Sequence, residues 1–266
     1  MNSSRIHPTA IVSPEAELAA DVIVGPWCVI DGPVRIGSGC RLISHVVLSG
    51  RTTIGADNRF FPFSSVGLEP QDLKYRGEPS EVVIGCGNTI REHATIHAGT
   101  EGGGMVTRIG DGNLIMAYAH VAHDCWLGNR IVLANAATLA GHVTIEDDAI
   151  IGGLSAVHQF LRIGRLAMIG GMSGIVQDVP PFTMIAGGYR PGLAGLNLVG
   201  LQRKGFDAAR IRRLKQVYRA LFQRDAAREE RIAAARAAAG DDEAAGHMVD
   251  FVAAAERGVT WPRGTE

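Results

Sequence analysis

The sequence has few cysteines, and this limits the kinds of site that it can build. Only 4 cysteines occur in 266 residues, and no two of them form a CxxC pair. This excludes a disulfide-stapled scaffold and gives no sign of a zinc-ribbon site. Cys28, Cys40 and Cys125 fall at positions that the repeat described below turns inward, whereas Cys86 does not. Buried free thiols suit a reducing compartment, so we expect a cytoplasmic protein without a metal centre.

Strong net charge and long apolar runs are also missing. The formal net charge is −1, from 26 basic and 27 acidic residues, which argues against general nucleic-acid binding. No apolar run approaches the roughly 20 residues that a helix needs to span a bilayer. Residues 1–10 lack the apolar core of a signal peptide. We therefore expect no nucleic-acid partner and no membrane span.

What the sequence does contain is an aliphatic residue at every sixth position. Three runs carry it, from Ile6 to Val66, from Ile84 to Ile96 and from Ile109 to Ile175, and Phe60 is the one residue in them that is not Ile, Leu or Val. A period of six matches neither a helix nor a flat strand. It fits a chain that turns a corner at every sixth position and closes a three-sided coil of 18. Stacked coils of this kind form a solenoid.

The interruptions of this repeat predict the domain organisation. We expect a β-solenoid over residues 1–186, with external loops near 68–80 and 97–108, where the pattern is lost. Pro180 and Pro181 are expected to end the regular pairing. Residues 187–266 should form a linker and a small C-terminal helical domain, with three helices between 206 and 257. The fold class is therefore all-β solenoid with a helical tail.

Basic residues gather at the start of this tail. The segment 203–224 holds eight basic side chains against one acid, Asp207; these are Arg203, Lys204, Arg210, Arg212, Arg213, Lys215, Arg219 and Arg224. A solvated helix face would look like this, and so would a docking surface for an acidic partner.

Histidines cluster in the middle of the solenoid. His97, His120, His123, His142 and His158 all avoid the inward positions, so they should project from the coils. Since stacked coils lie about 4.8 Å apart, residues separated by 18 lie above one another. The repeat therefore places His123 beneath Gly141, and Asp124 beneath His142.

This arrangement suits general-base catalysis. A carboxylate such as Asp124 can fix the tautomer of the adjacent His123, and a glycine N–H at Gly141 could stabilise an oxyanion. Cys125 points inward, so a substrate hydroxyl is the expected nucleophile. Two alternatives stay open at this point: a zinc ion between subunits, as in solenoid carbonic anhydrases, and ordinary surface histidines on a non-enzymatic scaffold.

Several motifs resemble one family. The loop QDLKYRGEP, the segment AHVAHDC followed by LAGHV, and then IGGLSAVHQF, QDVPPF and GLNLVGLQRKGF are similar to the UDP-N-acetylglucosamine O-acyltransferases up to about residue 225. The resemblance implies a homotrimer of left-handed parallel β-helices with active sites between subunits. It also implies transfer of a 3-hydroxyacyl group from the phosphopantetheine arm of acyl carrier protein to the sugar 3-hydroxyl, the first step of lipid A synthesis, without a cofactor.

The resemblance also implies roles for individual residues. His123 matches the general base, Asp124 its orienting partner and Gly141 the oxyanion donor. The positions that match contacts to the sugar, the nucleotide and its phosphates are Asp72, Lys74, His97, His120, His142, His158, Gln159, Asn197 and Arg203. Gly171 matches the position that limits acyl-chain length.

The sequence departs from the family at one position and leaves the acceptor open. Some members carry an acid where this chain has Val199, so a ribose contact there is lost or replaced. Gly171 has no side chain to block an acyl groove, which predicts acceptance of a longer chain. The acceptor could carry a 3-hydroxyl or a 3-amino group. A related N-acyltransferase has an additional N-terminal domain before its repeats, whereas here the hexads begin at Ile6.

Overall fold

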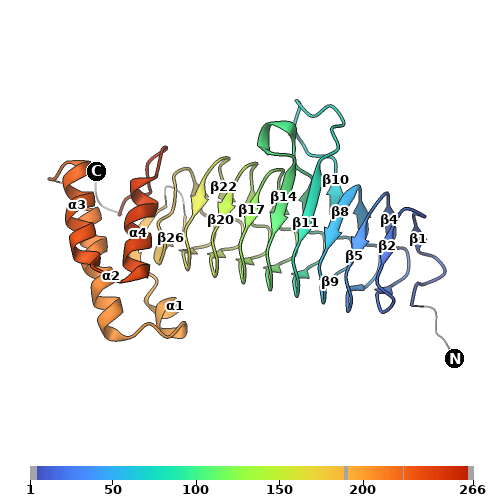
Figure 1. Ribbon diagram of the computed structural model, residues 1–266, viewed down its shortest axis with the longest axis horizontal. Helices are drawn as coiled ribbons and strands as arrows, with labels where there is room; N and C mark the ends of the chain where they lie inside the picture. The colour runs from blue at the N-terminus through green and yellow to red at the C-terminus, as the bar shows by residue number, and fades with distance from the viewer. Residues whose placement is uncertain (1–4, 189–190, 224, 263–266) are drawn as a thin grey trace.

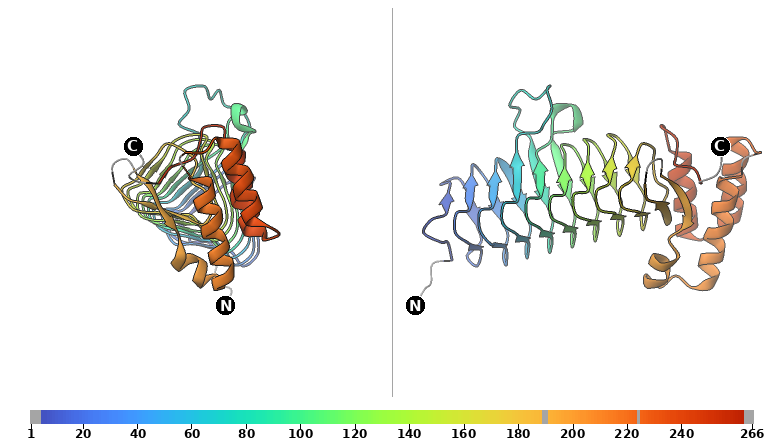
Figure 2. Two further views of the ribbon diagram at one scale, coloured as in Figure 1. Left: turned by 90° about the vertical axis from the view of Figure 1, so that its left-hand side faces the viewer. Right: turned by 180° about the vertical axis from the view of Figure 1, so that it is seen from behind.

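The chain forms a three-sided coil followed by a helical domain (Figure 1). The structure is a computed structural model that describes residues 5–188, 191–223 and 225–262. Viewed along its axis the coil has a triangular outline, with two loops leaving one corner (Figure 2). The coil is a left-handed parallel β-helix, so the expected fold class is confirmed.

Each side of the triangle is a parallel sheet of short strands. Sheet I contains β1 (Ile11–Val12), β4 (Val29–Asp31), β7 (Val47–Ser49), β10 (Ser65–Leu68), β13 (Thr95–His97), β16 (His120–Val121), β19 (Thr138–Leu139), β22 (Ala156–Val157) and β25 (Gly174–Ile175). Sheet II contains β2 (Glu17–Leu18), β5 (Arg35–Ile36), β8 (Arg51–Ile54), β11 (Glu81–Ile84), β14 (Val106–Ile109), β17 (Trp126–Leu127), β20 (Thr144–Ile145) and β23 (Arg162–Ile163). Sheet III contains β3 (Ile23–Val24), β6 (Arg41–Leu42), β9 (Arg59–Phe60), β12 (Thr89–Ile90), β15 (Leu114–Ile115), β18 (Val132–Leu133), β21 (Ile150–Ile151), β24 (Met168–Ile169), β26 (Thr183–Ala186) and β27 (Gly192–Leu196).

The strand register follows the repeat. His120 pairs with Thr138 and Thr138 with Ala156, so each step equals the standard coil that the sequence predicts. Two coils are longer, because Ser65 pairs with Thr95 and Thr95 pairs with His120. The additional residues form the two external loops, which span 69–80 and 98–105 because the flanking strands extend further than the sequence pattern predicts. Both loops leave the corner between sheets I and II.

The interior is the aliphatic column that the hexads predict. From Val24 onward its members are buried, whereas Ile6 is 38 % exposed because no earlier coil covers it. The corners need backbone with positive φ, and non-glycine residues adopt it there. Corner I–II includes Asp124, His142 and Phe160; corner II–III includes Arg130, Asp148 and Leu166; corner III–I includes Tyr118, Ala136, Leu154 and Met172.

A ladder of buried asparagines interrupts the apolar interior. Asn58 Oδ1 accepts from the amide nitrogen of Asn88 at 2.9 Å, and Asn88 Oδ1 accepts from that of Asn113 at 2.8 Å. The side-chain amides of Asn58 and Asn113 donate to the backbone carbonyls of Gly85 and Gly128, and that of Asn88 donates to Asn58 Oδ1. Each polar group is satisfied, so the ladder fixes the register of the coils where the loops are inserted.

The end of the coil differs from the prediction in two ways. Pairing does not stop at Pro180 and Pro181, because β26 pairs in parallel with β24 beyond them; the two prolines lie at a corner, where a missing N–H breaks no ladder. The expected linker contains a strand, β27, which pairs antiparallel with β26 and covers the edge of sheet III.

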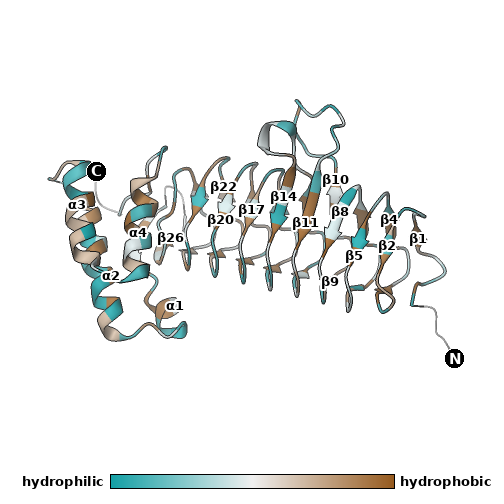
Figure 3. Cartoon of the chain, viewed as in Figure 1, coloured by the Kyte–Doolittle hydropathy of each residue, from teal (hydrophilic) through white to brown (hydrophobic). Residues whose placement is uncertain are grey.

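The helical domain consists of α1 (Leu198–Arg203), α2 (Ala208–Leu221), α3 (Arg228–Ala239) and α4 (Glu243–Ala253). The three helices expected between 206 and 257 are α2, α3 and α4. In Figure 3 hydrophilic and hydrophobic stretches share α2 and α3, as expected for helices with one buried face. No helix in the described part of the chain is long and apolar enough to cross a bilayer.

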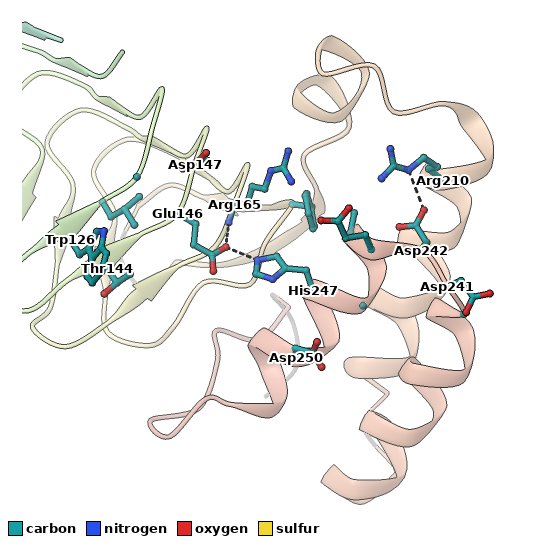
Figure 4. Close-up of a pocket in the computed structure, with 17 residues that line it drawn as sticks. Trp126, Thr144, Glu146, Asp147, Arg165, Arg210, Asp241, Asp242, His247 and Asp250 are labelled. Carbon is teal, nitrogen blue, oxygen red and sulfur yellow. Dashed lines mark hydrogen bonds and ion pairs between the residues drawn. The ribbon is translucent and has the colours of Figure 1, made fainter. Parts of the chain in front are cut away.

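A cleft of about 1040 Å³ separates sheet II from α4 and α2. His247 of α4 crosses it, and its Nε2 lies 2.7 Å from Glu146 Oε2 (Figure 4). Arg162 of β23 also reaches the domain, donating to the carbonyl of Phe251 at 2.9 Å. These polar contacts join the helical domain to the coil.

Candidate active site

His123 and Asp124 lie together at corner I–II, directly after β16. Asp124 has a φ of 58°, and this turn brings its Oδ2 to 2.8 Å from His123 Nδ1. A carboxylate accepts, so Nδ1 is assigned as the donor, and in the neutral imidazole Nε2 is then the free acceptor. The side chain of His123 is 14 % exposed and that of Asp124 is 0 % exposed. The imidazole therefore keeps access to a substrate while its partner is covered.

The Asp124 carboxylate is held by the 98–105 loop. Thr100 donates to it twice, from its amide nitrogen to Oδ1 at 2.8 Å and from its hydroxyl to Oδ2 at 2.6 Å. Thr107 Oγ1 accepts from the Asp124 amide at 2.8 Å. The two bonds from Thr100 hold the carboxylate in one orientation, and the bond to Thr107 holds the backbone that carries it.

The next coil brings Gly141 and His142 to the same corner, as the repeat predicts. The His142 amide donates to the His123 carbonyl at 3.0 Å. A side chain at Gly141 would have its Cβ only 2.5 Å from His123 Cε1. His142 Nε2 lies 3.8 Å from Asp124 Oδ2, and its ring stacks on Phe160 with centroids 4.2 Å apart.

Sheet I adds two further histidines beside this corner. The rings of His97 and His120 meet edge to face at 4.9 Å, and His120 Nδ1 lies 2.6 Å from Thr95 Oγ1. His97 is 6 % exposed, and its Nδ1 has no hydrogen-bond partner among the described residues. Burial lowers the pKa of His97 to about 4 and also lowers the pKa values of His120 and His142. These imidazoles are therefore neutral near pH 7.

The 69–80 loop brings charge to the same site. Asp72 raises and Lys74 lowers the pKa of His142, although burial is the largest influence on it. Both loop residues therefore lie within electrostatic range of that ring. The Lys74 amide donates to Asp72 Oδ1 at 3.0 Å, which fixes the turn that carries them.

His158 and Gln159 are exposed one coil above Gly141, at the same corner. His158 Nδ1 lies 3.2 Å from the Gln159 carbonyl, which also accepts from Arg257 at 3.3 Å. One standard coil separates Gly141 from Gln159 and places the second above the first. These two positions therefore extend the site along the coil axis.

Three of the sequence-predicted residues lie away from this corner. Asn197 caps α1 by accepting from the Gly200 amide at 3.0 Å, and its Nδ2 donates at 3.0 Å to the carbonyl of Leu166, at corner II–III. Arg203 is exposed at the end of α1. Gly171 lies next to corner III–I. One chain therefore does not bring these three residues to His123.

Sequence reasoning missed four neighbours of the site. Phe160 could have been found, because it follows His142 by one standard coil. Thr107 was missed because it does not stand one standard coil away from any of the clustered histidines. Arg257 belongs to the C-terminal segment, far from the repeat in sequence, and its guanidinium lies 5.1 Å from the Phe160 ring centroid. The position of Thr100 depends on the folded shape of a glycine-rich loop, for which the repeat gives no signal.

His123, Asp124 and His142 also form a group that could hold a metal, since one ligand atom from each lies within 4.8 Å of the others. Asp124 Oδ2 already accepts from His123 Nδ1 and the Thr100 hydroxyl, however, and Oδ1 accepts from the Thr100 amide. This leaves two imidazoles, one ligand fewer than a catalytic zinc site normally takes from protein.

The coil is that of the hexapeptide-repeat proteins, and the family comparisons place the chain among the transferases of that class. Residues 107–141 match the bacterial transferase hexapeptide model, and residues 178–260 match the model described as UDP-N-acetylglucosamine O-acyltransferase, domain 2. The acyl-[acyl-carrier-protein]–UDP-N-acetylglucosamine O-acyltransferase of Thermodesulfovibrio yellowstonii is 51 % identical over 256 residues, covering 96 % of this chain and 99 % of its own length. The relative of the same name from Anaeromyxobacter is 49 % identical, with 96 % and 99 % covered.

Solved structures agree with this assignment. The Acinetobacter baumannii protein aligns with a TM-score of 0.93 at 41 % identity, over 97 % of this chain and 100 % of that one. The Francisella novicida UDP-N-acetylglucosamine acyltransferase gives 0.93 at 38 % identity, over 97 % and 95 %. The chain belongs to the UDP-N-acetylglucosamine O-acyltransferase family and is an acyltransferase.

Proposed function

We propose that this protein transfers a 3-hydroxyacyl group from acyl carrier protein to the 3-hydroxyl of UDP-N-acetylglucosamine, the first step of lipid A synthesis, with His123 as the general base. The observation that carries the proposal is the His123–Asp124 pair at 2.8 Å, with the Gly141 backbone against the imidazole. The two substrates in this proposal are those given in the names of the relatives. Among the described residues, the thiol nearest in sequence, Cys125, is buried, which supports direct attack by the sugar.

In this mechanism the unprotonated Nε2 of His123 takes the proton of the sugar 3-hydroxyl as its oxygen attacks the thioester carbonyl. A carbon–oxygen bond forms and the negative charge moves to the carbonyl oxygen, for which the Gly141 amide is the proposed donor. The intermediate then expels the phosphopantetheine thiolate, which takes the proton from His123. Asp124 stabilises the imidazolium between these two steps. Neither a cofactor nor a metal is required.

The surrounding residues suit an uncharged sugar with a phosphate tail. His97, His120 and His142 are neutral because burial lowers their pKa values, so they can exchange hydrogen bonds with sugar hydroxyls without placing charge beside the base. We assign Asp72 to the sugar and Lys74 to the phosphates. His158 and Gln159 extend the same surface.

We further propose a cytoplasmic homotrimer with active sites between subunits. Asn197 lies at corner II–III and Arg203 at the end of α1, both away from His123, so they could meet a nucleotide bound at His123 only on a neighbouring copy. The outward positions of sheet III offer an apolar face for such a neighbour, with half-buried residues in register on successive coils: Leu114, Val132, Ile150 and Met168.

An acyl chain leaving His123 would cross sheet I toward Gly171. The outward residues on that path are small: Thr138, Ala156 and Gly174 lie in register on successive coils. This surface of small side chains leaves room for a methylene chain, and Gly171 has no side chain that would block the chain at the far edge of the sheet. We therefore propose a long hydroxyacyl donor.

The carrier protein would dock on the basic face of α2. Lys204 and Arg210 are already paired with Asp148 and Asp242, at 2.6 Å and 3.1 Å. Exposed residues of α2 that make no ion pair with any described residue remain for an acidic partner: Arg212, Arg213, Lys215 and Arg219. Arg224, which the sequence adds to this set, lies outside the described residues.

The decisive test measures ester formation from UDP-N-acetylglucosamine with hydroxyacyl carriers of several chain lengths, for wild type, His123→Ala and His7→Ala. His7 is an exposed histidine far from corner I–II and serves as the matched control. We expect His123→Ala to lose at least about 100-fold in kcat and His7→Ala to behave as wild type. Full activity of His123→Ala would refute the mechanism.

A zinc-dependent hydratase is the alternative to this mechanism, and it is disfavoured because both oxygens of Asp124 already accept hydrogen bonds from His123 and Thr100. Elemental analysis of the purified protein separates the two: stoichiometric zinc together with CO₂ hydration and no ester formation would overturn the acyltransferase mechanism.

A further inference from the structure

The 98–105 loop reaches across the site instead of projecting into solvent. The coil that contains it is longer than the standard coil of 18 residues, because Thr95 pairs with His120, 25 positions further along the chain. The added residues fold back against the coil, so that Thr100 contacts Asp124, which belongs to the next coil. The function proposed above gives this loop no role.

Thr100 uses its side chain in an unusual way. It is the N-cap of a short 3-10 helix, η1 (Glu101–Gly103), where threonine normally accepts a hydrogen bond from the following turn. Its hydroxyl makes no such cap and instead donates to Asp124 Oδ2 at 2.6 Å. That oxygen also accepts from His123 Nδ1, so Thr100 and His123 share one acceptor atom.

Glycine at position 103 permits this closure. A Cβ there would overlap Asp124 Cγ, a contact closer than any side chain tolerates. The loop backbone is thus packed directly on the carboxylate, whose side chain is 0 % exposed. Water has no access to Asp124 while the loop is in place.

The second external loop braces the first. Glu78 accepts from the Glu101 amide at 3.3 Å through one oxygen and from the Arg76 amide at 2.7 Å through the other. Met105 and Gly103 donate their amides to the Thr100 carbonyl at 2.9 and 3.1 Å. Thr100 is therefore fixed on both sides, which a group that orients a catalytic partner requires.

We propose that Thr100 is a positioning residue of the acyltransferase: its hydroxyl and amide hold the Asp124 carboxylate in the orientation that aligns His123, and Gly103 allows the loop to cover that carboxylate. The inference rests on the proposed role of His123 as base. Thr100 itself touches no reacting atom; it acts through Asp124.

The test compares Thr100→Val, which keeps shape and amide but removes the hydroxyl, with Thr100→Ser, which restores it. Thr52→Val is the matched control, because Thr52 is buried and its hydroxyl donates at 2.7 Å to a backbone carbonyl, that of Ser49, in an earlier coil. We expect Thr100→Val to lower kcat by about tenfold or more, a part of what a general base contributes. KM for both substrates should stay within about twofold, Thr100→Ser should recover most of the rate, and Thr52→Val should keep wild-type kcat.

A double mutant separates positioning from a general effect on folding. If Thr100 acts through Asp124, adding Thr100→Val to Asp124→Ala should cost little further activity. Multiplicative losses, or a Thr100→Val enzyme that keeps more than half of kcat, would overturn the inference. If His123→Ala is inactive and Thr100→Val is fully active, the proposed function stands and only this inference fails; an active His123→Ala removes the basis of both.

Discussion

Alanine at position 141 should disable the base without removing any catalytic group. In Gly141→Ala the new Cβ would lie 2.5 Å from His123 Cε1 and 2.7 Å from Nε2, whereas ordinary contacts begin near 3.4 Å. The imidazole must therefore retreat by about 0.9 Å, and misplacement by roughly 1 Å can cost about 100-fold in rate. The amide of residue 141 remains, so loss of the proposed oxyanion donor would not explain the effect.

The assay is steady-state ester formation with both substrates varied. We expect kcat to fall by about 100-fold, while the melting temperature stays within a few degrees of wild type because only one ring must move. Gly246→Ala is the control, since a Cβ there meets nothing within 4 Å. Retention of more than half of the wild-type kcat by Gly141→Ala would show that the ring is not confined by this backbone.

Three further predictions concern the acyl groove, the carrier and the interdomain contact. Gly171→Met should shorten the longest hydroxyacyl chain used, and an unchanged chain-length profile would refute the groove. Charge reversal of Arg212 and Arg213 to Glu should raise KM for the acyl carrier by about tenfold and leave KM for the nucleotide sugar unchanged. A variant whose KM for the acyl carrier equals that of wild type would refute docking on this face. His247 has its pKa raised by its hydrogen bond to Glu146, so the contact stabilises at low pH and is lost as pH rises through that pKa. His247→Gln should thus lower the free energy of unfolding most between about pH 5 and 6, by less than about 1 kcal/mol because both groups are partly exposed, and least at pH values well above that pKa; a difference that stays constant with pH would contradict the reasoning.

The repeat made much of this structure predictable. Because each standard coil advances by the same number of positions, the sequence alone aligns Gly141 with His123 and His142 with Asp124. Asn58, Asn88 and Asn113 each stand two positions before an inward residue of the repeat, so the same spacing also marks them as inward-facing.

Features outside the repeat were less accessible. Strand β27 has no hexad phase, because its partner β26 sets its position. The contact between Thr100 and Asp124 depends on the path of a loop, and glycine-rich sequence permits many paths. The position of Asn197 at corner II–III follows from the route of the chain after the last coil, which local sequence does not encode.

The separation of Asn197 from His123 onto different corners has a genetic consequence. In the proposed trimer each site would take corner I–II from one subunit and corner II–III from the next, so two differently damaged chains could complement each other. Co-expression of His123→Ala with Arg203→Glu in equal amounts would leave about a quarter of the sites with both halves intact. The mixed trimers should then form the ester at a rate that neither variant reaches alone.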